Sequence, residues 1–152
     1  RFESGRRLHF RFHRMSGDSF AMESRLSLRF RNYRKALGLY ESAIQPKMSV
    51  LEQEGLIQRF EYTFELAWKC LQDLLTERGL AEVKGPRPVI EQSFKDGIIA
   101  DGVTWLEMLT SRNETVHLYD EATFKRTSER VRGKYIEALK RFEKEIEKWV
   151  RP

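Results

Sequence analysis

The chain has 152 residues, a single cysteine and a formal net charge of +5 at pH 7. This length suits one domain, and Cys70 alone excludes an intramolecular disulfide, which favours a reducing, cytoplasmic compartment. No apolar run approaches the roughly 20 residues of a membrane span, so we expect a soluble protein without a membrane partner.

The positive charge is concentrated at the start of the chain. Residues 1–21 hold five arginines against Glu3 and Asp18, and a basic tail attracts phosphate whatever the folded domain does. The segment has no sustained apolar period, so we predict a disordered leader or tag-like segment. A basic arm that grips RNA is the alternative. The folded domain is expected to span residues 22–152.

A first long helix is expected directly after this segment. Apolar residues from Leu26 to Ile44 recur at alternating steps of four and three, which places them on one face of a helix. Pro46 follows and is expected to end the helix.

A second, longer helix is expected to begin at a capping box. Ser49 and Glu52 have the spacing at which a serine oxygen and a glutamate satisfy free amide groups of a first turn. The apolar stripe then runs from Phe60 to Leu74, and Gly79 is a plausible left-handed terminator.

The chain then changes pattern. Glycine and prolines interrupt the periodicity between Lys84 and Pro88, and a short helix is predicted from about Pro88 to Asp96, ended by Gly97. This short helix is expected to be an insertion between the second and third long helices.

Two further long helices complete the predicted fold. Asp101 is expected to cap a helix that contains Asn113 and Val116, and Asp120 to cap a last helix that reaches Trp149. We therefore predict an all-α fold: an antiparallel, up-and-down four-helix-type bundle with one short extra helix.

The third long helix departs from the pattern of a core helix. Leu106 and Leu109 are followed on the same stripe by Asn113, and Arg112 lies beside it. An unpaired buried charge is strongly unfavourable, so these polar groups must be paired, line a cleft or lie at an interface. On a continuous helix, the step from Arg112 to His117 spreads them over about 140 degrees, so that they bracket a ligand.

The residue types suit a phosphodiester substrate. Arg112 offers a planar fork of donors to phosphate oxygens, and His117 can move a proton near neutral pH. RNA supplies its own nucleophile, the 2′-hydroxyl, so cleavage needs no metal ion or cofactor in principle. Because each chain has one plausible histidine, a two-fold homodimer would supply both the acid and the base.

A structural alternative accounts for the same residues. Arg112 can pair with Glu61 or Glu65 of the second helix, and His117 can cap a helix end. Spacing alone does not decide between this alternative and a catalytic site.

The segment Arg112–Tyr119 resembles the Arg-x4-6-His signature of HEPN proteins. With its trailing tyrosine, it is similar to the Arg-x4-His-x-Tyr form of HEPN toxins paired with minimal nucleotidyltransferase (MNT) antitoxins. Three other segments resemble, in order, the family once called nucleotidyltransferase substrate-binding proteins: Arg59 to Lys69, Pro86 to Phe94 and Asp101 to Trp105. The resemblance covers residues 24–150.

The resemblance implies a homodimeric bundle with the motif at a cleft between subunits, and ribonuclease activity in toxic members. It implies that Arg112 binds phosphate, that His117 transfers protons and that Asn113 supports them. Tyr119 would be the hydroxyl that the MNT partner adenylylates, which would place bulk and negative charge where the RNA phosphate must sit.

Two other functions remain open from the sequence. The chain can be a non-catalytic subunit that presents nucleotide or substrate to a nucleotidyltransferase, with Arg112 and Asn113 binding phosphate. It can also be a purely structural helical dimer.

Overall fold

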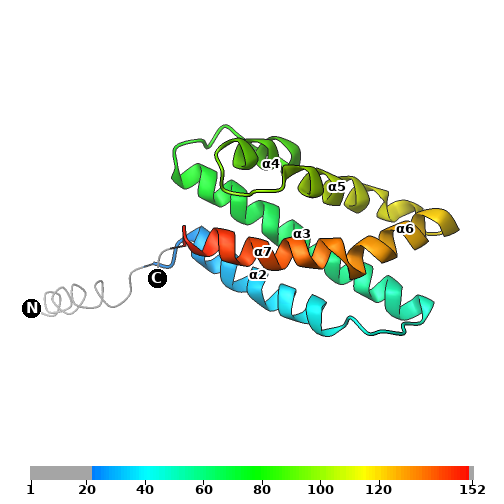
Figure 1. Cartoon of the computed structure of the whole chain (residues 1–152). Coiled ribbons are helices and arrows are strands. Elements are labelled where there is room, and N and C mark those ends of the chain that lie inside the picture. Colours follow the sequence, from blue (N-terminus) through cyan, green and yellow to red (C-terminus); the bar gives the residue numbers. More distant parts are fainter. Residues whose placement is uncertain (1–21, 151–152) are drawn as a thin grey trace, which may run out of the picture.

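The computed structural model describes residues 22–150, and the predicted leader at residues 1–21 lies outside this range. Helices account for the regular structure of this part of the chain, which contains no strand (Figure 1). The elements are α2 (Arg25–Ser42), α3 (Val50–Glu77), α4 (Pro86–Lys95), α5 (Gly102–Asn113), the 3₁₀ turn η2 (Glu114–His117), α6 (Glu121–Arg132) and α7 (Lys134–Glu147).

The central element is α3, which packs against α2, α4, α6 and α7. The long elements α2, α3, α5 and the α6–α7 pair run in alternating directions, and the short α4 packs on α3 and α5 (Figure 1). The prediction of an all-α, four-helix-type bundle with one short extra helix is confirmed. None of the described helices is long and apolar enough to cross a membrane.

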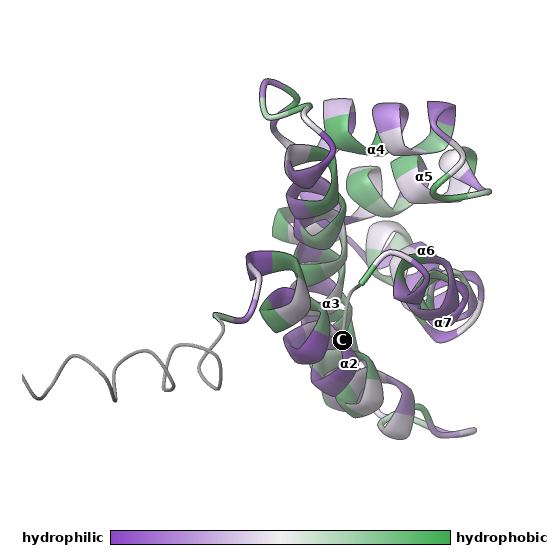
Figure 2. Cartoon of the chain, turned by 90° about the vertical axis from the view of Figure 1, so that its left-hand side faces the viewer, coloured by the Kyte–Doolittle hydropathy of each residue, from purple (hydrophilic) through white to green (hydrophobic). Residues whose placement is uncertain are grey.

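Aromatic side chains join the helices at the centre of the core. Phe60 of α3 stacks on Tyr135 of α7 with ring centroids 5.1 Å apart, and Trp105 of α5 meets Phe142 of α7 edge-on at 4.9 Å. Figure 2 shows the matching surface pattern, with hydrophilic residues over the outer turns of α6 and α7. Burial of such large rings is strongly stabilising.

The predicted start signals are confirmed. The Ser49 hydroxyl accepts a hydrogen bond from the Glu52 amide at 3.1 Å, and the Glu52 carboxylate accepts one from the Ser49 amide at 2.8 Å. Asp101 and Asp120 accept hydrogen bonds from the amides three residues further on, at 3.0 and 2.9 Å. Gly79 follows α3 with a φ of 88°, the left-handed conformation expected of a terminator.

Two predictions of helix continuity are wrong. The third long helix leaves α-geometry after Asn113, so Val116 and His117 lie on η2 and not on α5. The last helix is broken at Gly133, where φ is −123° and ψ is −92°, and Trp149 lies beyond the end of α7. A Cβ at position 133 would lie 3.3 Å from a backbone oxygen, so glycine suits this break.

The boundaries of the short helix also differ from the prediction. In the structure, α4 begins at Pro86, two residues before the predicted start at about Pro88. A proline is tolerated in the first turn because the amide it lacks would have no partner there.

Truncation of Phe60 tests the central role of the aromatic core. This side chain is fully buried, so Phe60→Ala is expected to lower the free energy of unfolding by about 3–5 kcal/mol. The matched control is Phe94→Ala, because Phe94 is 52% exposed and its loss removes less buried surface than the loss of Phe60. Urea unfolding measures both variants, and equal losses would contradict this description of the core.

Candidate functional site

The motif residues lie where α5 gives way to α6, at one end of the bundle (Figure 1). Arg112 belongs to the last turn of α5, and Asn113 is its final residue. His117 ends η2, and Tyr119 lies in the turn before α6. The motif therefore forms a helix end and a tight turn instead of one helix face.

Local hydrogen bonds hold the turn in shape. The Thr115 hydroxyl lies within hydrogen-bond distance of the Arg112 carbonyl at 2.9 Å and of the Glu61 carboxylate at 2.8 Å. The amide of Asp120 donates to the His117 carbonyl at 3.0 Å and closes the turn before α6 begins. One carboxylate of α3 thus fixes η2 against the body of the bundle.

A second carboxylate of α3 holds the arginine. Arg112 forms an ion pair with Glu65, and both side chains are 29% exposed. The guanidinium also donates to Oδ1 of Asn113 at 3.1 Å. The pairing with the second helix that the sequence left open is therefore present. Because a guanidinium carries more donors than these two contacts use, its partly exposed edge can still receive an anion.

His117 and Tyr119 lie on the solvent side of the turn. The imidazole is exposed, and the Tyr119 side chain is 85% exposed. Their rings meet edge to face at a centroid distance of 6.0 Å. His117 stands in the last turn of η2, and its imidazole forms no side-chain hydrogen bond to another residue of 22–150.

Within one chain, the structure does not join Arg112 directly to His117. Arg112 is drawn toward α3 by Glu65, whereas the His117 ring lies beside Tyr119. The sequence-based geometry, with both on one continuous helix, is wrong because α5 ends at Asn113 and His117 lies on the 3₁₀ turn η2. An anion reaching both groups must bridge the end of α5 and the end of η2.

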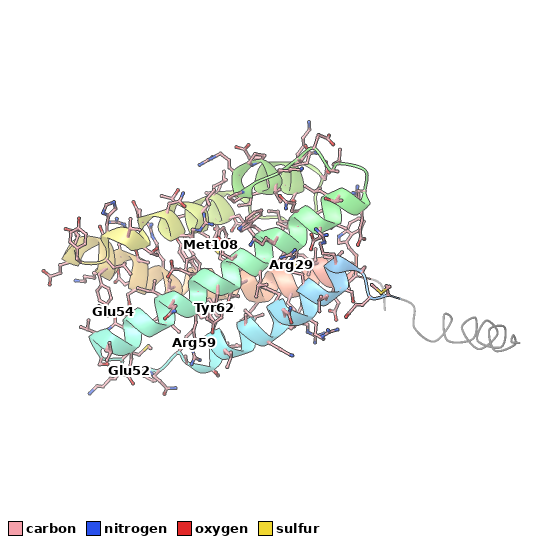
Figure 3. All side chains as sticks on the ribbon, turned by 180° about the vertical axis from the view of Figure 1, so that it is seen from behind. Arg29, Glu52, Glu54, Arg59, Tyr62 and Met108 are labelled. Carbon is pink, nitrogen blue, oxygen red and sulfur yellow. The ribbon has the colours of Figure 1, made fainter. Side chains whose placement is uncertain are left out.

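The charge around the arginine is dominated by α3. This helix carries six acidic and two basic residues, and Figure 3 shows two of the acidic ones, Glu52 and Glu54, near its start. Glu61 and Glu65, four residues apart, are the members of this set that contact the motif. Their i, i+4 spacing places both glutamates on one face of α3, but it does not say which residues face them.

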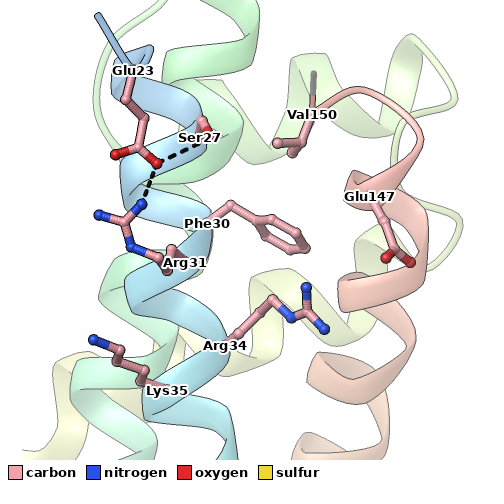
Figure 4. Close-up of a pocket in the computed structure, with 8 residues that line it drawn as sticks. All are labelled: Glu23, Ser27, Phe30, Arg31, Arg34, Lys35, Glu147 and Val150. Atoms are coloured by element: carbon pink, nitrogen blue, oxygen red, sulfur yellow. Dashed lines mark hydrogen bonds and ion pairs between the residues drawn. The ribbon is translucent and has the colours of Figure 1, made fainter. Parts of the chain in front are cut away.

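A cavity of about 720 Å³ lies at the opposite end of the bundle, between α2 and the end of α7 (Figure 4). Arg31 there bonds to Glu23, and Arg34 pairs with Glu143 at 2.9 Å. The cavity mixes cations with carboxylates, so its charge selects no single class of ligand. In the described part of the chain, no group of three or more metal-ligating side chains comes together.

The sequence reasoning missed the partners that α7 gives to the motif helix. Ser111 and Tyr135 are both buried, and their hydroxyl oxygens lie 2.6 Å apart. A serine preceding Arg112 carries no signal of such a contact in the sequence, because its partner is 24 residues away.

Comparisons with known proteins agree with this architecture. The sequence model of the family described as "Nucleotidyltransferase substrate binding protein like" matches residues 28–148, which include the whole motif. A crystal structure of a protein from Thermus thermophilus is similar, with 32% identity and a TM-score of 0.67 over 79% of this chain and 99% of that one. No curated protein matches the chain.

Asp120, which caps α6 directly after Tyr119, should make the stability of the fold depend on pH. Hydrogen bonds from the amide and hydroxyl of Thr123 hold the pKa of Asp120 below its usual range. Its stabilising effect is therefore present above the unfolded-state pKa of about 3.9. The effect is lost as the pH falls through the lower folded-state pKa.

Asp120→Asn keeps an acceptor at the start of α6 but removes the titration. We expect the stability advantage of the wild type over this variant to be constant near neutral pH and to fall once the pH drops below the unfolded-state pKa of about 3.9. Urea unfolding at each pH measures the difference. A constant or growing advantage in acid would show that the capping carboxylate is not stabilising.

Proposed function

Because the chain belongs to the nucleotidyltransferase substrate-binding protein-like family, a HEPN-type family, we propose that it is the HEPN toxin of a pair with an MNT antitoxin. We further propose that it cleaves RNA as a homodimer, without a metal ion. The observation that carries the proposal is the Arg112–Tyr119 turn, which presents a partly exposed guanidinium, an exposed imidazole and an exposed phenol at one end of the bundle.

Each group has a defined part in the proposed cleavage. The guanidinium of Arg112 binds a non-bridging oxygen of the scissile phosphate and offsets the charge that develops there. The 2′-hydroxyl of the RNA attacks phosphorus and loses its proton to a base, while an acid gives a proton to the leaving 5′-oxygen. The products are a 2′,3′-cyclic phosphate and a 5′-hydroxyl.

Glu65 and Asn113 orient the arginine in this scheme. The ion pair with Glu65 and the hydrogen bond to Asn113 occupy one side of the guanidinium. A planar group held on one side presents its other edge in a fixed direction, which reduces the entropy lost when phosphate binds.

A second copy of the chain completes the proposed site. The reaction needs a base and an acid, and the motif supplies a single imidazole, which is exposed and free to meet a partner. Two motifs related by a two-fold axis would place His117 of each copy on opposite sides of one phosphate. RNA, a second copy and the MNT protein are thus the proposed partners.

Tyr119 is the proposed site of control by the MNT partner. Its side chain is 85% exposed and its ring lies 6.0 Å from that of His117, centroid to centroid. The hydroxyl oxygen would attack the α-phosphorus of ATP, releasing pyrophosphate and one proton. The attached AMP adds negative charge beside His117 and would repel an RNA phosphate.

A non-catalytic subunit is the second candidate function. The separation of Arg112 from His117 within one chain favours it, because phosphate binding needs the arginine but no proton transfer. In that case the turn would present a nucleotide or another phosphorylated substrate to a nucleotidyltransferase.

His117→Ala separates the two candidates. If the chain is a ribonuclease, the substitution should lower RNA cleavage by about 10²–10⁴-fold, the usual contribution of an acid–base group. The matched control is Tyr119→Phe, which keeps the neighbouring ring and should retain cleavage. Gel analysis of RNA incubated with each purified protein in EDTA gives the result. Equal cleavage by wild type and His117→Ala would remove the ribonuclease proposal.

Adenylylation of Tyr119 is tested by mass spectrometry. After incubation with the cognate MNT protein and ATP, the wild type should gain the mass of at least one AMP, and Tyr119→Phe should gain none. Tyr62→Phe is the control, because Tyr62 is a partly exposed tyrosine on α3, outside the motif. Modification of Tyr119→Phe to the same extent as wild type would place the acceptor elsewhere.

A further inference from the structure

The break between α6 and α7 brings side chains of both helices to one residue of α5. Lys134 Nζ lies 2.8 Å from one carboxylate oxygen of Glu107, and a terminal nitrogen of Arg130 lies 3.6 Å from the other. Arg130 and Lys134 are four residues apart and lie on either side of the break at Gly133, and both reach this one carboxylate.

The same bend brings a hydroxyl to the backbone of α5. Tyr135 and Ser111 are 0% and 1% exposed, and their hydroxyl oxygens lie 2.6 Å apart. The Tyr135 hydroxyl also donates to the carbonyl of Glu107 at 3.2 Å. Since that proton is used, Ser111 donates to the tyrosine oxygen, and the three groups form one buried chain of hydrogen bonds.

These contacts involve the last helical turn of α5, which carries Arg112. Ser111 directly precedes Arg112, and Glu107 lies one turn earlier on the same face of α5. The other side of this turn is held by Glu65 through its ion pair with Arg112. The last turn of α5 is thus fixed from two sides, by α3 and by the α6–α7 bend.

We propose that Tyr135, acting through Ser111, is a positioning residue for Arg112. This inference rests on the proposed function, in which Arg112 binds the scissile phosphate. The last turn of a helix has few backbone bonds of its own and frays readily. Bonds from Tyr135 to Ser111 and to the Glu107 carbonyl tie this turn to the core, so the guanidinium keeps the direction that the phosphate requires.

The chain offers a matched control for the hydroxyl. Tyr33 is also fully buried, and its hydroxyl donates to the carbonyl of Leu139, where α2 meets α7. Removing the Tyr33 hydroxyl deletes one buried bond to a helix carbonyl, and removing the Tyr135 hydroxyl deletes a bond of the same kind together with the bond to Ser111. Phenylalanine keeps the ring contacts of both residues, including the stacking of position 135 on Phe60. A purely structural role predicts the same behaviour for the two variants.

The experiment compares Tyr135→Phe with Tyr33→Phe in the full chain. Steady-state RNA cleavage gives kcat and KM. The Nε–Hε signal of Arg112 in a ¹⁵N NMR spectrum, assigned with Arg112→Lys, reports the orientation and surroundings of the guanidinium. We expect Tyr135→Phe to lower kcat by about 10- to 100-fold, with little change in KM, and to shift or broaden the Arg112 signal. Tyr33→Phe should leave both readouts as in wild type.

Ser111→Ala tests the route of the effect. If Tyr135 acts through Ser111, the double variant should be no worse in kcat than the poorer single variant. Fully additive losses would overturn the proposed route. Equal effects of Tyr135→Phe and Tyr33→Phe, or an Arg112 signal unchanged by Tyr135→Phe, would overturn the positioning role.

The NMR readout separates this inference from the proposed function. If the wild type cleaves no RNA, the ribonuclease proposal fails, and the Arg112 signal alone then decides the positioning role. A signal disturbed in Tyr135→Phe and intact in Tyr33→Phe supports that role even then.

Discussion

A partly buried arginine must keep an anionic partner, and this constraint shapes the end of the bundle that carries the motif. Arg112 projects from the last turn of α5 toward α3, where Glu65 neutralises it. Without that partner, the guanidinium would lose contacts with water on burial and form no ion pair to compensate for them. The end of α5 therefore packs against α3 where Glu65 supplies a carboxylate. The position of η2, which follows α5, depends on this packing.

The same helix meets two opposite requirements along its length. Toward the centre, α3 buries Phe60 and Phe64 against rings from α2, α5 and α7. On another stripe it presents Glu61 and Glu65, which bind Thr115 and the arginine of the motif. One rigid element thus anchors the core and holds the polar turn. Substitutions that disturb the packing of α3 should therefore shift the motif even where the substituted residue does not contact it.

The motif gains its exposure from the change of helix type. A continuous α-helix would have kept Val116 and His117 in register with α5, but the chain changes to the tighter η2 after Asn113, and both side chains are exposed there. The Thr115 hydroxyl has a single proton and lies within hydrogen-bond distance of both the Glu61 carboxylate and the Arg112 carbonyl, a backbone group at the helix end. The short turn thereby separates a held arginine from an exposed histidine.

The sequence alone predicted the all-α antiparallel bundle and the helix starts marked by Ser49, Asp101 and Asp120, because apolar periodicity and caps act over a few neighbouring residues. It also singled out Arg112 and Asn113, polar residues that continue an apolar stripe, and His117 one turn beyond. Tertiary structure decided the rest. It chose Glu65 as the partner of Arg112, and it bent the last helix at Gly133 so that Tyr135 reaches Ser111. Such contacts join residues far apart in the chain, and no local pattern encodes which of several possible partners packing will bring within bonding distance.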